Sequence, residues 1–202
     1  MRQSGARNYD ELRHAAYTKL GHEVRQQFDD LPVKTSYHHG EGDYADSKEM
    51  RHDVLHNGHL AVFQGGDRHD FLHHVDPRTK LNENEMFRAV HDAYGHALHG
   101  STFGAQGEER AWNAHRQMFS PLAALAMSAE TRGQNSFVNY TPINARLKAD
   151  KHAIEAEIAR ARRFKDRETE QEALERKKKT MAGWQYAPQK AVLLPPEMVD
   201  PK

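Results

Sequence analysis

The chain has 202 residues, which is enough for one domain with a hydrophobic core and short for two. Lys and Arg number 29, as do Asp and Glu, so the formal charge is zero and strong binding of duplex nucleic acid is not expected. The absence of cysteine excludes disulfides, thiolate zinc sites and a cysteine nucleophile. The 15 histidines are the unusual feature, and most of them lie between His38 and His99.

The first part of the chain predicts helices around one short strand. Residues 9–29 carry apolar side chains at every fourth position, which predicts an amphipathic helix. Residues 33–45 are predicted to form a loop, and residues 46–55 a short helix that opens with a capping box. A short apolar stretch followed by two glycines predicts a strand and turn over residues 59–65. A long loop is expected over residues 67–82, and such loops often have a function.

The second part is predicted to be almost entirely helical. A capping box at residues 82–85 opens a helix that ends at Gly100, and the next helix runs from Gly107 to Phe119, with Trp112 and Met118 in the core.

The sequence Ser120-Pro121 combines an N-cap with a proline at the first helical position, so another helix begins there. Residues 131–136 are predicted to form a polar loop. Residues 141–180 favour a helix, and its charged second half is expected to be exposed to solvent.

Together these elements predict one mainly α-helical domain, with a small β element near residues 59–65. Its core would span about residues 9–147, and the charged helix 148–180 and the tail 181–202 would pack on this core or protrude from it. The start lacks the apolar stretch of a signal peptide, and no apolar run of about 18 residues occurs, so a cytoplasmic protein without a membrane partner is expected.

Two histidines of one predicted helix, His91 and His96, are the strongest candidates for a functional site. His91 lies on the buried face, one turn after Phe87, and His96 follows about 140° further round an α-helix. Histidine is the commonest metal ligand among side chains, and this pair can converge on one ion near the helix end. Gly95 removes a side chain between them, so a neighbouring element can approach.

A metal held by two histidines needs a third ligand and open positions for a substrate or dioxygen. Two histidines and one carboxylate on one face supply this arrangement for non-haem iron. Glu130 is the best candidate for the third ligand because it ends an apolar helix and begins a polar loop. Glu108 or Glu109, at the start of an earlier helix, could take its place.

Other polar residues complete the predicted site. The candidate catalytic residues are Asp92, Glu108, His115 and Arg132, and the candidate substrate contacts are Tyr94, Arg132, Gln134 and Asn135. A second group of histidines lacks the regular spacing of metal ligands and consists of His56, His59, His69, His73 and His74. Within this group His59 and His69 are the better candidates, since they flank the predicted strand and its turn.

Three segments resemble a domain found in bacteriophages and mobile elements, alone or within very large polyvalent proteins. They are residues 87–96, residues 107–120 and residues 130–136. The resemblance covers roughly residues 45–140 and implies a phage or prophage origin, with the host cytoplasm or the virion as the location. It implies no particular activity.

The motif His91-x-x-x-Gly95-His96, followed later by a glutamate, is similar to the iron site of the pterin-dependent aromatic amino acid hydroxylases. The resemblance implies that His91, His96 and Glu130 bind Fe(II). Asp92 stands where that family usually has glutamate, and the chain is shorter than such a catalytic domain.

We therefore expect an Fe(II)-dependent oxygenase or hydroxylase that acts on a small molecule, a nucleotide or a base, with an organic reductant of unknown identity. One alternative is a zinc-dependent hydrolase with Glu108 or Asp92 as the general base. The other is a non-enzymatic phage structural or injected protein, in which the charged helix 150–180 is the interaction surface. The sequence predicts no oligomeric state.

Overall fold

In a computed structural model, the described residues are 2–39, 44–187 and 190–199. The internal contacts divide the chain into two compact units, and we describe each by itself. Unit 1 comprises Met1–Gly133 with Pro188–Lys202, and unit 2 comprises Gln134–Ala187. The fold class is mainly α, as predicted. The prediction of a single domain stays a prediction.

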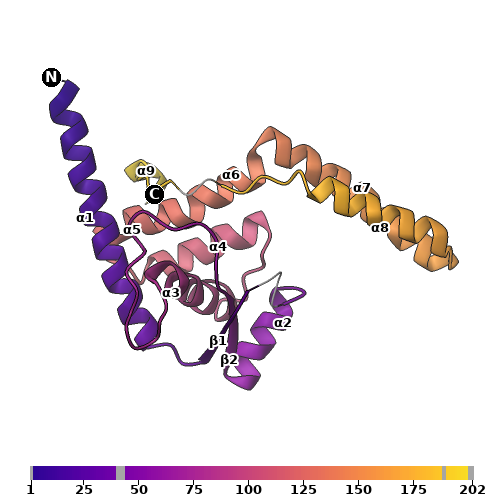
Figure 1. The fold of residues 1–202 in the computed structure, drawn as a ribbon, viewed down its shortest axis with the longest axis horizontal. Coiled ribbons are helices and arrows are strands. Elements are labelled where there is room, and N and C mark those ends of the chain that lie inside the picture. The colour runs from indigo at the N-terminus through magenta and orange to yellow at the C-terminus, as the bar shows by residue number, and fades with distance from the viewer. Residues whose placement is uncertain (1, 40–43, 188–189, 200–202) are drawn as a thin grey trace. The chain divides into compact units, whose positions relative to one another are not determined.

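Unit 1 consists of helices and one two-stranded sheet, which lies to one side of them (Figure 1). Three of its helical segments are π-helices, whose hydrogen bonds join residues five positions apart, and they are labelled η. In chain order the elements are α1 (Arg2–Asp29), β1 (Lys34–His38), α2 (Ser47–His52), η1 (Asp53–Asn57), β2 (His59–Phe63), α3 (Glu83–Val90), η2 (His91–Ala97), α4 (Ala105–Arg116), α5 (Pro121–Ser128), η3 (Ala129–Gly133) and α9 (Pro196–Val199).

The main core of unit 1 lies where α1 packs against α3 and α5. The predicted apolar stripe of α1 supplies Tyr17, Leu20 and Val24, each at most 1% exposed. They belong to the same cluster as Trp112 of α4 and Met127 of α5. Burial of an aliphatic or aromatic side chain of this size stabilises the fold by roughly 1.5–3 kcal/mol, so this interface fixes the helices that carry the site.

The sheet contains one strand that the sequence predicted and one that it did not. β2 confirms the predicted strand. The loop predicted over residues 33–45 is wrong at β1, and residues 40–43 of that range lie outside the described residues. The two strands are parallel, with Lys34 opposite His59 and Ser36 opposite Ala61. β1 is mostly polar, and its strand conformation depends on a partner that follows later in the chain, so no local pattern revealed it.

Helix starts were predicted well in this unit. Asn82 and Glu85 form the predicted capping box of α3, and Ser120 caps α5 by accepting from the backbone N–H of Ala123. Two predictions are wrong. Residues 131–136 belong to η3 and to the next helix, α6 (Gln134–Tyr140), and are not a loop. Met118 is 45% exposed because it lies in the turn after α4.

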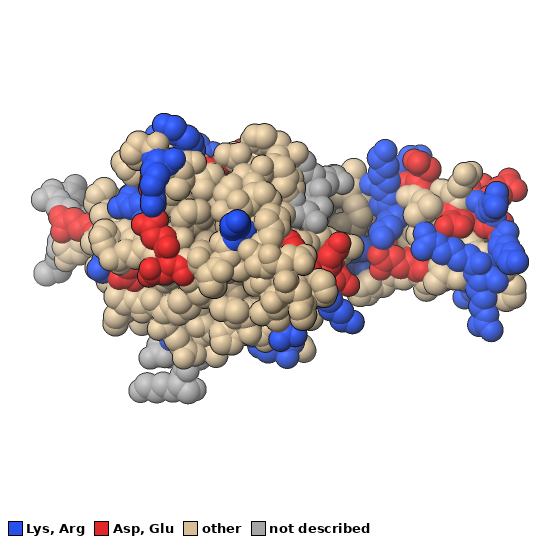
Figure 2. Space-filling model, turned by 90° about the horizontal axis from the view of Figure 1, so that it is seen from below, with Lys and Arg blue, Asp and Glu red and all other residues tan. Residues whose placement is uncertain are grey.

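Unit 2 contains α6 (Gln134–Tyr140) and a long hairpin of α7 (Pro142–Phe164) and α8 (Arg167–Met181). The single charged helix predicted over residues 148–180 is wrong, because Lys165 adopts a left-handed conformation (φ 56°) and Asp166 caps α8. Ion pairs such as Arg162–Glu170 join the two antiparallel helices. Lys, Arg, Asp and Glu cover the hairpin densely, with both signs interspersed (Figure 2).

Among the described residues, no helix combines the length and the apolar composition that crossing a bilayer requires.

Candidate metal centre

The π-helical geometry of η2 brings His91 and His96 to one side of the chain. In an α-helix a spacing of five residues separates two side chains widely. In a π-helix each hydrogen-bonded turn joins residues five positions apart. The side chain five positions further along the chain therefore returns close to the first one. The bond from Leu98 N–H to Ala93 O, at 3.0 Å, is one of these wide turns. The imidazole rings lie edge to face, with centroids 5.1 Å apart.

Glu108, from the first turn of α4, completes a group of three possible ligands. Its Oε2 lies 3.3 Å from Nε2 of His96 and 3.8 Å from Nε2 of His91. One ligand atom from each residue lies within 4.8 Å of the others. Ligand atoms that each lie about 2.0–2.2 Å from one ion are roughly 3–3.5 Å from one another. The three side chains would therefore need to move only slightly closer together to bind an ion.

Two glycines allow α4 to carry Glu108 this close to η2. A Cβ on Gly95 would lie 3.1 Å from the carbonyl oxygen of Ala111 in α4, and a Cβ on Gly107 would lie 1.9 Å from that of Thr102. A side chain at either position would displace α4 or the loop before it. The prediction that Gly95 lets a neighbouring element approach is confirmed.

A hydrogen bond on the far side of His96 orients its ring. Its Nδ1 lies 3.3 Å from the carbonyl oxygen of Ser101, which can only accept, so Nδ1 carries the proton and donates. The other nitrogen, Nε2, therefore directs its lone pair toward Glu108. Histidine ligands of metals usually donate their second N–H to a carbonyl or carboxylate in this way.

A longer chain of hydrogen bonds orients His91 through two buried residues. Gln27 of α1 donates from Nε2 to the carbonyl oxygen of Met118 (3.3 Å), so its Oε1 faces Nε2 of His115 at 2.7 Å. This oxygen accepts, and Nε2 of His115 must therefore carry a proton.

His115 then determines which nitrogen of His91 is protonated. Burial and the neighbouring charge of His91 lower the pKa of His115 well below its usual value, so the ring is neutral and its Nδ1 accepts. Nδ1 of His91 lies 3.2 Å away and must donate. In the neutral rings, the Nε2 lone pairs of His91 and of His96 therefore both face Glu108.

The electrostatics favour a positive charge between these three groups. When Nε2 of each ring carries a proton in place of a metal ion, burial works to raise the pKa of Glu108, but hydrogen bonds from His91 and His96 outweigh it and lower that pKa to about 2. Burial works to lower the pKa of His96, but the hydrogen bond and the charge of Glu108 raise it. A proton or a divalent cation can satisfy this preference. The side chain of Glu108 is 27% exposed, so the position can be reached from solvent.

Asp92 and Tyr94 lie close to this centre. Burial raises the pKa of Asp92, and the nearby charges of His91 and His96 partly offset the rise, which places its carboxylate within their electrostatic range. The ring of Tyr94 packs 6.2 Å from that of His115, while its hydroxyl donates to the carbonyl oxygen of Asp30. The structure thus brings Asp92 and Tyr94 close to the histidine pair, as the sequence predicted.

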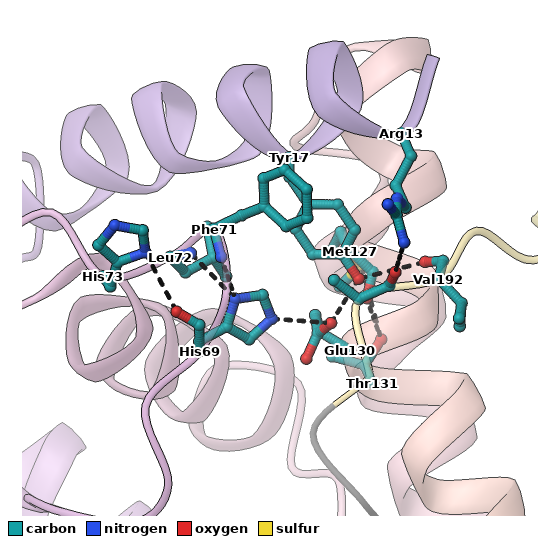
Figure 3. A network of polar contacts seen from close by, with 11 residues as sticks. Arg13, Tyr17, His69, Phe71, Leu72, His73, Met127, Glu130, Thr131 and Val192 are labelled. Atoms are coloured by element: carbon teal, nitrogen blue, oxygen red, sulfur yellow. Dashed lines mark hydrogen bonds and ion pairs between the residues drawn. The ribbon is translucent and has the colours of Figure 1, made fainter. Parts of the chain in front are cut away.

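Glu130 does not belong to this group, so its prediction as the third ligand is wrong. In Figure 3 it lies between α1 and the loop before α3, where it accepts a hydrogen bond from the hydroxyl of Tyr17. Its Oε1 is also 3.1 Å from Nε2 of His69. The backbone N–H groups of Phe71 and Leu72 donate to Nδ1 of His69, so Nε2 carries the proton toward Glu130. The packing of α5 on α1 turns Glu130 in this direction.

The other predicted catalytic and substrate residues have different surroundings. Arg132 forms an ion pair with Glu109 at 2.8 Å, and its guanidinium lies 4.4 Å from the centre of the Trp112 ring. Both partners belong to α4, so Arg132 connects η3 to that helix. Gln134 and Asn135 begin α6 in unit 2, and their role as substrate contacts stays a prediction.

Sequence reasoning missed Gln27 and Ser101, which orient the two histidines. Gln27 is one of two adjacent glutamines on α1, and only the packing of α1 against the site shows which of them is buried.

Comparison with family models, with curated proteins and with solved structures found no match for this chain.

Proposed function

We propose that this chain is a metal-dependent enzyme in which His91, His96 and Glu108 hold ferrous iron for an oxygenase or hydroxylase reaction. The observation that carries the proposal is the convergence of Nε2, Nε2 and Oε2 from two packed elements, with both imidazole tautomers set by hydrogen bonds. No other group of three such ligands occurs among the described residues.

The chemistry of the donor set favours iron. Two neutral imidazoles and one carboxylate on one side are the arrangement typical of non-haem Fe(II) oxygenases, which keep the remaining positions open. Ferrous iron bound there would supply the activation of dioxygen. The protein would hold the ion, keep both Nε2 atoms unprotonated and leave the Glu108 side accessible to a small molecule, a nucleotide or a base.

The resemblance to the pterin-dependent hydroxylases is now confined to the histidine pair, since the third ligand comes from a different place in the chain. The phage origin implied by the other resemblance remains our proposal.

Asp92 supports a second candidate, a zinc-dependent hydrolase. Zinc also binds two histidines and one glutamate in hydrolytic sites, with water as a further ligand. The carboxylate of Asp92 lies within the electrostatic range of His91 and His96, which places it to take a proton from that water. In this reading Asp92 is the general base.

Metal binding to the full chain under anaerobic conditions separates these candidates. We expect one equivalent of Fe(II) to bind, and nitric oxide to bind the iron where dioxygen would, giving a paramagnetic complex. The Glu108→Gln variant should lose this complex. Glu109→Gln should keep it, because the Glu109 carboxylate pairs with Arg132 and is not one of the three ligands.

Zinc retained in preference to iron, with ester or amide hydrolysis that Asp92→Asn abolishes, would instead establish the hydrolase. A wild-type chain that binds neither ion would overturn both candidates and leave the non-enzymatic alternative.

A further inference from the structure

A second polar cluster lies on the outer face of the two-stranded sheet, apart from the metal centre. Nε2 of His59, the first residue of β2, lies 2.9 Å from Oγ of Ser36 in β1. Nδ1 of the same ring lies 2.7 Å from Oδ2 of Asp53, the first residue of η1. The order hydroxyl, imidazole, carboxylate, with Nε2 toward the hydroxyl, is the arrangement that activates serine nucleophiles.

The sheet register places the serine and the histidine on the same face. Ser36 is paired with Ala61, two residues after His59, and side chains two apart on a strand point to the same side. The alternate residues Leu60 and Val62 are at most 1% exposed and face the core. The cluster therefore faces away from the core, and 37% of the His59 side chain is exposed.

The turn between η1 and β2 brings Asp53 to the ring. Gly58 ends the π-helix in the left-handed conformation (φ 61°), which reverses the chain so that residues 53 and 59 meet. A side chain at this position would be strained by the positive φ.

Three side chains donate to the carboxylate of Asp53. Besides His59, these are Asn57, whose Nδ2 is 2.7 Å from Oδ1, and Tyr44, whose hydroxyl is 2.8 Å from Oδ2. The hydrogen bonds from Asn57 and His59 lower the pKa of Asp53 to about 2, so it is ionised at neutral pH. An ionised carboxylate can only accept, so Nδ1 of His59 carries a proton and Nε2 is placed to accept the proton of Ser36.

We propose that Ser36 is the nucleophile of an acyl-transfer site, with His59 as its general base and Asp53 as the positioning residue. Oγ of Ser36 would attack the carbonyl carbon of a carboxylic ester while its proton moves to Nε2 of His59. The bond to the leaving alcohol then breaks, and the alcohol oxygen takes that proton. Water, deprotonated by His59, would release the acid and restore the hydroxyl of Ser36.

The surroundings of the serine indicate an ester with an apolar acyl group. Phe63, four residues after His59 on the same face of β2, is 41% exposed and offers an apolar surface. Its ring also contacts the guanidinium of Arg88, 5.3 Å from the ring centroid. This activity is independent of the metal centre, because it uses none of its ligands.

A fluorophosphonate probe, which reacts covalently with activated serines, tests this proposal on the full native chain. Peptide mass spectrometry should locate the label at Ser36, and chelators should not change its rate. The rate should fall by about 10²-fold or more in His59→Gln, in line with the loss of a general base. Ser47→Ala, a change at another serine of the same region, should label normally.

Asp53→Asn should slow labelling and also move the pH at which the rate is half-maximal, because the carboxylate stabilises the protonated imidazole. A purely structural role would change only folding, which circular dichroism of each variant reports. Labelling of native wild-type Ser36 no faster than in urea-denatured protein would overturn the proposal. So would hydrolysis of p-nitrophenyl acetate that persists undiminished in Ser36→Ala.

Discussion

Replacing Gln27 by leucine removes the acceptor that sets the tautomer of His91 through His115, although Gln27 touches none of the three proposed ligands. The side chain is 9% exposed, and its Oε1 accepts from Nε2 of His115 at 2.7 Å. Without this acceptor, a buried N–H loses its partner at a cost of about 1–3 kcal/mol. His115 can avoid this cost by moving its proton to Nδ1, which faces His91.

The relocated proton would force His91 to accept at Nδ1 and to carry its own proton on Nε2, where the metal must bind. Metal binding then has to restore the original tautomers. Loss of such an outer hydrogen bond typically weakens metal affinity about 10–100-fold, or about 1.4–2.7 kcal/mol. The affinity of Gln27→Leu, measured by titration against a competing chelator, should fall by this factor.

Gln26→Leu is the matched control, because Gln26 precedes Gln27 on α1 and is exposed. Its metal affinity should equal that of the wild type. An unchanged dissociation constant in a folded Gln27→Leu variant would refute the proposed chain of hydrogen bonds.

Three further perturbations test the surrounding structure. Gly95→Ala adds a Cβ 3.1 Å from the carbonyl oxygen of Ala111. The free energy of unfolding, measured with denaturant, should therefore fall by about 1–3 kcal/mol, and metal binding should weaken. An unchanged free energy of unfolding would contradict the close packing. Tyr17→Phe removes the donor to buried Glu130 and should cost about 1–3 kcal/mol in the same assay without altering metal affinity. Because the pKa of Asp53 is lowered to about 2 in the folded chain, its contribution to stability is present above about pH 4 and is lost as the pH falls toward 2. The stability difference between wild type and Asp53→Asn should shrink over that window, and a constant difference would refute the assignment.

The sequence predicted those parts of the fold that depend on local signals. Capping residues such as Asn82 and Ser120 mark helix starts, and the apolar stripe of α1 identified the buried face. Prediction from the sequence failed where the conformation of a segment depends on residues distant in the chain. The strand β1 forms because β2 pairs with it. The turn at Lys165 was missed because it contains no glycine or proline, the residues that usually indicate a turn.

The candidate site shows the same division. The histidine pair was visible in the sequence, but an α-helical geometry was assumed for it, and the π-helical turn that brings the rings together has no simple sequence signal. The choice between Glu108 and Glu130 depends on which face of each helix meets which neighbour. Only the packing of α4 against η2, and of α5 against α1, decides it.

The most direct test of the metal centre is the stoichiometry of divalent metal bound by the wild type, Glu108→Gln and Glu130→Gln. Both variants remove one buried or partly buried carboxylate charge and keep the side-chain volume. We predict about one equivalent in the wild type and in Glu130→Gln, and a large loss in Glu108→Gln. Retention of the metal by a folded Glu108→Gln variant, or its loss in Glu130→Gln alone, would contradict the site described above.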